Sequence, residues 1–196
     1  MNYDILPDGY SLYRNIDLNT DNIKTAVQVA AFVTLAVMVV PAGIAVPPWR
    51  TQAFVPLSLL SVAYLLLFVA VSVFGYMLLH ELVHGICFRV FGGGKARYGN
   101  QLPSYLYAAS DRYIAKSRYV LIGLAPLVVL TILFSIACVL VPQSWFWIPY
   151  FALTSNVAGC AGDVYVCLFV LPRVPNDALV LDSGVAMEIY SRESTR

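Results

Sequence analysis

The residues with the clearest chemical potential are two histidines and a glutamate that lie within five positions of one another. Positions 80–84 read H-E-L-V-H, and the chain of 196 residues has only these 2 histidines. Side chains four positions apart lie on one face of a helix, so His80 and His84 can bind one zinc ion. Glu81 lies beside them and can accept a proton from a water molecule. The pattern therefore predicts a zinc site of the metalloprotease type.

A second interpretation treats the same three residues as ordinary polar side chains at a membrane interface. Their depth argues against it. His80 precedes the first basic residue of the following loop, Arg89, by a length of helix that spans about 13 Å. An unpaired carboxylate at that depth in hydrocarbon is costly, and ionisable residues inside a membrane are functional candidates. We therefore favour the metal site.

The third ligand can be sought by elimination, because a zinc ion with a catalytic water takes three protein ligands. No histidine remains, and the other glutamates, Glu188 and Glu193, lie beyond the last apolar stretch. Asp163 is the acidic residue inside such a stretch. A carboxylate in hydrocarbon needs a partner more urgently than a thiol does, so we expect Asp163 to be the ligand. Cys160 and Cys87 are the rival candidates.

The position of Asp163 supports this choice. Asp163 precedes Arg173 by nearly the same number of residues as His80 precedes Arg89. Because both segments are expected to run in the same direction, the two side chains should lie at matching depths in the membrane. Polar side chains recur around it at spacings of four, three and four, which predicts one helix face. These residues are Asn156, Cys160, Asp163 and Cys167.

The composition indicates the environment in which these residues must be held. Apolar residues make up 60% of the chain and charged residues 12%, whereas soluble globular domains carry about 25% charged residues. A net charge of +1, from 12 Lys+Arg against 11 Asp+Glu, offers no basic surface for nucleic acid. The sequence therefore predicts a membrane protein whose main surroundings are the lipid bilayer.

Four apolar stretches are long enough to cross a bilayer, which takes about 20 helical residues. The stretch 119–162 is about twice that length and must turn back, most simply at Pro142-Gln143-Ser144. We expect an all-α membrane protein with four transmembrane helices near 25–46, 56–88, 119–141 and 145–171. The corresponding division is an N-terminal segment 1–22, a catalytic transmembrane domain 23–171 and a C-terminal tail 172–196.

The positions of the basic residues predict the orientation, because basic loops stay on the cytoplasmic side. With four crossings, both termini and the loop between the second and third helices share one side. That side holds every lysine and arginine except Arg50. We therefore expect a multi-pass protein of the cell membrane with both termini in the cytoplasm. The acidic segment 1–22 also lacks the basic start of a cleavable signal peptide.

The loop 89–118 has the features of a small β-hairpin. Residues 96–98 and 102–108 form two candidate strands around a Gly99-Asn100 turn. An edge of this hairpin could pair with an extended substrate by strand addition, or the loop could lie on the headgroups with its tyrosines as interfacial anchors. A second hairpin around 182–184 is expected in the tail.

Together these motifs resemble those of the site-2 proteases, zinc enzymes that cut peptide bonds inside membranes, and more closely those of the four-helix zincin membrane peptidases. The similarity covers about 74–190 and includes HELVHG at 80–85, GLAP at 123–126, NVAGCAGDVYV at 156–166 and PNDALVLDSG at 175–184. The resemblance implies that His80, His84 and Asp163 hold zinc and that Glu81 is the catalytic base. It also implies that Asn156 helps to position the substrate or the oxyanion.

The expected function is that of a zinc-dependent intramembrane endopeptidase that hydrolyses membrane-embedded protein segments near the cytoplasmic face. Its cofactor would be Zn2+, its catalytic residues Glu81 and Asn156, and its partner a membrane-spanning protein substrate. Two alternatives remain open: a non-catalytic membrane protein that binds metal or partner helices, and a zinc hydrolase of a lipid-like small molecule. The presence of Glu81 favours hydrolysis, because metal ligands alone do not require it.

Overall fold

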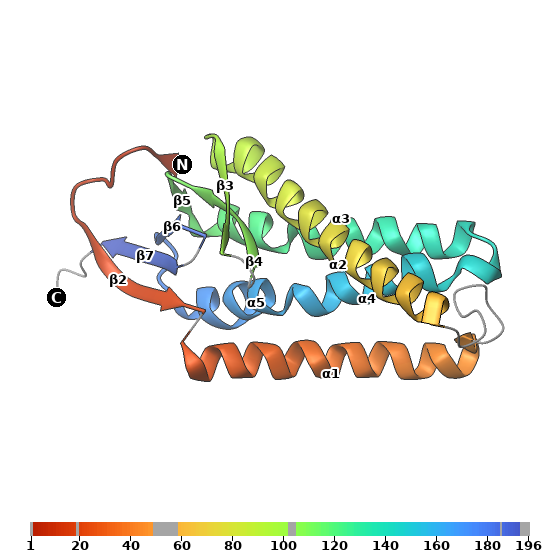
Figure 1. Cartoon of the computed structure of the whole chain (residues 1–196). Coiled ribbons are helices and arrows are strands. Elements are labelled where there is room, and N and C mark those ends of the chain that lie inside the picture. Colours follow the sequence, from red (N-terminus) through yellow and green to blue (C-terminus); the bar gives the residue numbers. More distant parts are fainter. Residues whose placement is uncertain (1, 19, 49–58, 102–104, 185, 193–196) are drawn as a thin grey trace. The chain divides into compact units, whose positions relative to one another are not determined.

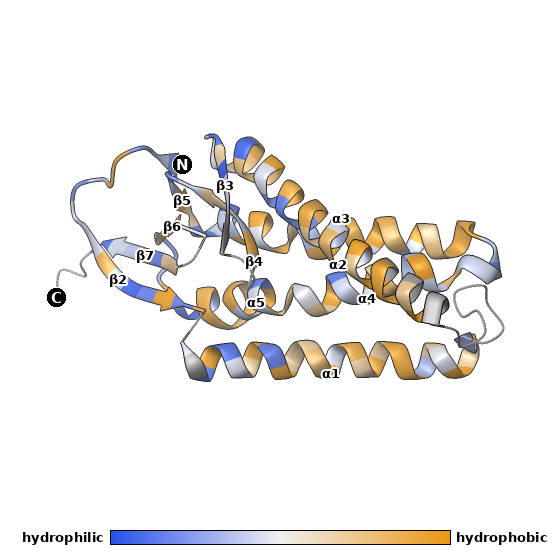
Figure 2. Ribbon diagram, viewed as in Figure 1, coloured by the Kyte–Doolittle hydropathy of each residue, from blue (hydrophilic) through white to orange (hydrophobic). Residues whose placement is uncertain are grey.

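The computed structural model describes the chain except for residues 1, 19, 49–58, 102–104, 185 and 193–196. Within the described part, four helical spans are long and apolar enough to cross a membrane. The first three fall largely within α1 (Asp21–Ala45), α2 (Leu59–Cys87) and α3 (Lys116–Leu140). The fourth is Trp147–Arg173 (Figure 1). Figure 2 shows hydrophobic residues along the length of these helices. The predicted number of apolar spans is confirmed.

Prolines lie just beyond the ends of two of these helices, where they disfavour continuation because proline has no N–H and restricts the residue before it. Helix α1 ends at Ala45, just before Pro47 and Pro48. Helix α3 ends at Leu140, and a short 3-10 turn over Gln143–Trp145 follows Pro142. The predicted corner between the third and fourth spans is therefore confirmed.

The sequence predicted one continuous helix for the fourth span, and this prediction is wrong. It consists of α4 (Trp147–Gly159), α5 (Ala161–Val164), a π-helical segment over Tyr165–Val170 and a 3-10 turn over Leu171–Arg173. Cys160 separates α4 from α5, with backbone angles φ −73° and ψ 3°. Glycine has a low helix propensity, and Gly159 and Gly162 flank this position. The glycines therefore account for the interruption.

The description of the chain as all-α is incomplete, because the structure contains a five-stranded antiparallel sheet of order β1-β5-β6-β7-β2. The segment 1–22 supplies two of its strands, β1 (Asn2–Tyr3) and β2 (Tyr10–Asp17). The strand β5 (Tyr113–Ala115) precedes α3, and β6 (Leu179–Asp182) and β7 (Ala186–Arg192) follow the fourth span. The predicted tail hairpin is confirmed as β6 and β7, with Gly184 in the turn at φ 81°.

The predicted hairpin between the second and third helices is also confirmed. Strand β3 (Ala96–Gln101) pairs antiparallel with β4 (Tyr105–Ser110). The turn predicted at Gly99-Asn100 is wrong, because both residues lie within β3 and Gly99 pairs with Tyr107. The connecting residues 102–104, which the sequence analysis assigned to the second strand, lie outside the described residues.

The chain divides into two units, and the first combines the sheet with helix ends. It contains Met1–Val27, Glu81–Ala125 and Gly162–Arg196. Its apolar core joins Ile122 of α3 and Val166 of the fourth span to Ile114, Val180 and Ile189 of the sheet, all buried. Burial of these apolar side chains is the main force that holds the sheet on the helix ends.

The second unit is helical and contains Gln28–His80 and Pro126–Ala161. Two aromatic side chains connect the fourth span to α1 and to the residue that follows it, by hydrogen bonds to backbone carbonyls. The hydroxyl of Tyr150 donates to the carbonyl of Met38 at 2.7 Å, and the indole Nε1 of Trp147 donates to that of Val46 at 3.2 Å. Tyrosine and tryptophan suit such positions because each has an apolar body and one polar group.

Candidate metal centre

Helix α2 carries the H-E-x-x-H motif near its C-terminal end. The helix is continuous across the motif, so His80 and His84 lie one turn apart on it. The boundary between the two units falls between His80 and Glu81. His80 is therefore the last residue of this helix in the second unit, and Glu81 and His84 belong to the first.

In the first unit, His84 lies beside Asp163. The distance from Nε2 of His84 to Oδ1 of Asp163 is 3.6 Å, and the two side chains are 12% and 27% exposed. The other ring nitrogen, Nδ1, lies 3.1 Å from the carbonyl oxygen of Ile122. A carbonyl oxygen can only accept a hydrogen bond, so Nδ1 carries a proton and Nε2 is the ring nitrogen that faces Asp163.

This pair of side chains fits zinc. Imidazole nitrogen and carboxylate oxygen are both zinc ligands, with bonds of about 2.0–2.2 Å. Two such ligands on a tetrahedral ion lie about 3.4 Å apart, close to the 3.6 Å between Nε2 of His84 and Oδ1 of Asp163. A metal-binding histidine almost always donates its second ring N–H to a carboxylate, a carbonyl or water, as Nδ1 of His84 does to Ile122.

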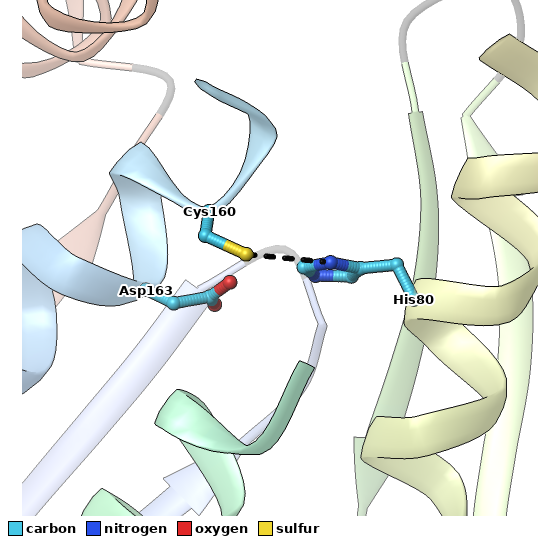
Figure 3. Close-up of side chains that lie close together, drawn as sticks. All are labelled: His80, Cys160 and Asp163. Carbon is cyan, nitrogen blue, oxygen red and sulfur yellow. Dashed lines mark hydrogen bonds between the residues drawn. The ribbon is translucent and has the colours of Figure 1, made fainter. Parts of the chain in front are cut away.

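In the second unit, His80 is buried against α4. Its Nδ1 lies 3.8 Å from Sγ of Cys160, which is fully buried. Figure 3 shows this sulfur directed at the imidazole ring, with Asp163 three residues further along the chain. The ring of Tyr76 packs edge-on against His80, with centroids 5.8 Å apart. These contacts fix the orientation of the His80 side chain.

Asn156, the second predicted catalytic residue, is fully buried in the second unit. Its Nδ2 lies 3.4 Å from the carbonyl oxygen of Pro126 and 3.3 Å from Oγ1 of Thr131. Its Oδ1 lies 3.8 Å from Sγ of Cys160. These contacts connect α4 to α3 and hold the thiol of Cys160 near His80, while the role of Asn156 toward substrate remains a prediction.

The two rival cysteine ligands have different surroundings. Cys87 packs against the apolar core of the first unit, which is the usual behaviour of a buried cysteine. Cys160 contacts His80, so it remains the stronger rival to Asp163.

Two features near His84 were missed by the sequence analysis. The first is the carbonyl of Ile122, a backbone atom with no signal of its own. The second is Asp182 at the end of β6, whose carboxylate accepts hydrogen bonds from the hydroxyl of Tyr119 at 2.5 Å and the N–H of Gly184 at 2.7 Å. Burial raises the pKa of the Asp182 carboxyl above its ordinary value, while these two hydrogen bonds oppose the rise.

Comparison with known proteins identifies the family to which the chain belongs. A family model described as "Putative zincin peptidase" matches residues 73–179, and the chain belongs to this family. The matched range contains both motif histidines, Glu81, Asn156 and Asp163. Family membership indicates a zinc peptidase.

One curated relative also matches, and it has no described activity. The chain is 28% identical over 151 residues to the "Uncharacterized 24.7 kDa protein in gap 5'region" of Pyrococcus woesei. The alignment covers 74% of this chain and 65% of that protein, so the chain spans less than two thirds of the length of the relative. No solved structure matches the chain.

Proposed function

We propose that the chain is a zinc-dependent intramembrane endopeptidase that cleaves membrane-embedded protein segments near the cytoplasmic face. The observation that carries the proposal is the orientation of His84, whose Nδ1 donates to the carbonyl of Ile122 while Nε2 faces Asp163 at 3.6 Å. A histidine fixed in this way is prepared to bind a metal ion through Nε2. Membership of a zincin family supports the same reading.

The proposed zinc ligands are His80, His84 and Asp163. Both histidines belong to α2, so their spacing follows from the helix itself. His84 contacts Asp163, and His80 contacts Cys160 three residues earlier in the chain. The contact between His84 and Asp163 supports these two ligands, and the proposal adds His80 from its spacing in the motif.

In the proposed reaction, zinc would polarise the scissile carbonyl and lower the pKa of a water molecule toward about 7. Glu81 takes a proton from this water as the new C–O bond forms on the carbonyl carbon. When the peptide C–N bond breaks, Glu81 gives the proton to the departing amine, so the carboxylate returns to its starting state. The proposed role of Asn156 is to position the substrate or the oxyanion.

The proposed location is the cell membrane, with both termini in the cytoplasm. The four apolar spans support a multi-pass arrangement. The orientation rests on the basic residues, all of which except Arg50 fall on one side of the four spans. This side would also hold the sheet of the first unit.

The hairpin of β3 and β4 is the proposed binding place for an extended substrate. A transmembrane helix must unwind before hydrolysis, and its freed amide groups then need new hydrogen-bond partners. Strand addition to a hairpin edge supplies them. The hairpin lies close to the motif, because the hydroxyl of Tyr98 in β3 packs where a side chain on Gly85 would lie. Gly85 directly follows His84.

The proposal is tested by comparing the purified wild-type protein with the variant Glu81→Gln. We expect zinc to be bound by both and single-pass membrane substrates to be cleaved only by the wild type. The matched control is Glu188→Gln, which makes the same change in strand β7 and should leave cleavage intact. Equal cleavage by Glu81→Gln would remove Glu81 from the mechanism. Bound zinc without peptide cleavage by the wild type would favour the lipid-like substrate or the non-catalytic role.

A further inference from the structure

One backbone carbonyl of α3 is available for a contact outside its own helix. In an α-helix the carbonyl of residue 122 accepts a hydrogen bond from the N–H of residue 126. Position 126 is a proline within α3, and proline has no N–H. Its ring also displaces the carbonyl four residues earlier, away from the helix axis. Ile122 therefore loses its helical donor at the point where His84 donates to it.

The contact that replaces this donor is made by the proposed zinc ligand. Nδ1 of His84 lies 3.1 Å from the oxygen of Ile122, and Ile122 is 1% exposed. A buried carbonyl without a partner would cost about 1–3 kcal/mol, so the pairing satisfies α3 as well as His84. A carbonyl oxygen accepts only, so in the neutral ring the contact selects the Nδ1–H tautomer and leaves Nε2 facing Asp163.

The surrounding packing holds this part of α3 in place. Gly123 follows Ile122, and a side chain there would lie 2.5 Å from Sγ of Cys167, so glycine allows the close approach. Pro126 is fully buried, and its own carbonyl lies 3.4 Å from Nδ2 of Asn156. The motif GLAP at 123–126 was given no chemical role from sequence. In the structure its glycine allows close packing against Cys167, and its proline leaves the carbonyl of Ile122 without a helical donor.

We propose that Pro126 is a positioning residue for metal binding. Because proline has no N–H, the carbonyl of Ile122 can accept a hydrogen bond from His84 instead. This contact fixes the tautomer and ring orientation of that histidine. The inference rests on the proposed zinc site for its effect on metal affinity, but its effect on the tautomer can be measured in metal-free protein. It assigns no contact with substrate to Pro126.

The test is the substitution Pro126→Ala, which supplies the missing N–H and offers Ile122 a competing helical donor. The 15N chemical shifts of the histidine rings report the tautomer, and the chain has only 2 histidines, so a His80→Gln variant assigns them. At alkaline pH, where the imidazole ring is neutral, we expect His84 to be an Nδ1–H tautomer in the metal-free wild type and a mixture in Pro126→Ala. We also expect the zinc dissociation constant to rise by about 10–100-fold, the usual effect of losing an outer-shell partner.

Two control variants separate this effect from general damage. Pro41→Ala makes the same chemical change in α1, where Pro41 is exposed. Leu130→Ala leaves a cavity in α3 at a buried position without adding an N–H. Both should keep the wild-type tautomer of His84 and the wild-type zinc affinity. If Pro126→Ala does not fold, Pro126→Val supplies the same N–H with a volume closer to that of proline.

The outcomes distinguish this inference from the proposed function. A wild-type His84 in the Nε2–H form, or a folded Pro126→Ala or Pro126→Val protein with the wild-type tautomer and zinc affinity, would overturn the role of Pro126. If the tautomer depends on Pro126 but the wild-type protein does not bind zinc, Pro126 controls the His84 tautomer, and both its role in metal binding and the zinc peptidase are overturned. If the His84 tautomer and the zinc affinity change in the Pro126 variants but not in the two control variants, the positioning role of Pro126 and the proposed zinc site are both supported.

Discussion

The hydroxyl of Tyr119 donates a 2.5 Å hydrogen bond to Oδ2 of Asp182, which ties the start of α3 to the end of strand β6. Tyr119 is 6% exposed and belongs to the apolar core of the first unit. Three residues later, α3 presents the carbonyl of Ile122 to His84. The sheet thus holds the helix turn that orients the proposed ligand, a link between the tail of the chain and the motif in α2.

This link predicts the effect of Tyr119→Phe. The substitution removes the hydroxyl and leaves the Asp182 carboxyl with one fewer hydrogen bond, so we expect the free energy of unfolding to fall by about 1 kcal/mol. Tyr13→Phe is the control, because Tyr13 is 50% exposed and its substitution should change the stability by less than about 0.5 kcal/mol. Denaturant unfolding in detergent measures both, and equal effects would contradict the link.

The raised pKa of Asp182 predicts a pH dependence of stability. Burial raises the pKa from an ordinary value of 3.8, so the folded state holds the proton more tightly than the unfolded state. The stability from this group is therefore fully present below the unfolded pKa and is lost as pH rises through the higher folded pKa. The charged or titratable groups that act on it are Tyr119, His84 and Asp163.

The variant Asp182→Asn checks this sign. Asparagine can accept from the N–H of Gly184 with its oxygen and donate to the hydroxyl of Tyr119 with its amide nitrogen. It does not titrate, so the fall in stability with rising pH should be smaller than in the wild type. Thermal unfolding between pH 4 and 7 measures the difference. A wild-type stability that rises over the same interval relative to Asp182→Asn would show that the sign is wrong.

The helical spans could be predicted from sequence because apolar length alone determines them. The five-stranded sheet could not. Strand β2 is exposed along most of its length, which removes the alternation that marks a half-buried strand. Its partner β7 lies at the other end of the chain, where Tyr10 pairs with Arg192, and such distant pairing leaves no local signal. The hairpin β6–β7 was predictable because its turn is local.

The candidate metal site could be proposed from sequence because two histidines and a glutamate at helical spacing form a local pattern, and its ligands remain a prediction. The interruption of the fourth span was not predicted, although Gly159 and Gly162 provided a signal for it. The carbonyl of Ile122 could not be found directly, because a backbone atom has no residue type. Its sequence signal is Pro126 four residues later. That signal can be interpreted only when the structure shows that His84 lies beside Ile122.

Gly123 predicts a loss of stability on substitution by alanine. The added carbon would lie 2.5 Å from Sγ of Cys167, which is buried, so we expect Gly123→Ala to lower the free energy of unfolding by about 1–3 kcal/mol. Gly43→Ala in α1 is the control. No atom lies within 4 Å of the added carbon there, and alanine should raise the stability by about 0.5–1 kcal/mol. Adding Cys167→Ala to Gly123→Ala should recover part of the loss, and no recovery would locate the strain elsewhere.

Zinc removal should destabilise the wild-type protein, because a ligand that binds only the folded state shifts unfolding by mass action. At a free zinc concentration about 100 times the dissociation constant, we expect a stabilisation of about 2.7 kcal/mol. The measurement is the unfolding temperature after chelation and after return of zinc. Identical unfolding temperatures in the two states would contradict a zinc site in the folded chain.

The choice between Asp163 and Cys160 as third ligand predicts unequal effects of their substitution. Asp163→Ala removes the carboxylate that faces Nε2 of His84 at 3.6 Å. Loss of an outer-shell partner costs about 10–100-fold in metal affinity, so loss of a direct ligand should cost more than about 100-fold.

Cys160→Ala removes only a contact with His80 and Asn156, so its effect on zinc affinity should stay below about tenfold. Cobalt substituted for zinc gives a second measurement, because a thiolate ligand produces a sulfur-to-metal charge-transfer absorption and a carboxylate does not. The wild-type spectrum should lack this band. Undiminished zinc affinity in Asp163→Ala, together with a thiolate band that disappears in Cys160→Ala, would transfer the third position to Cys160.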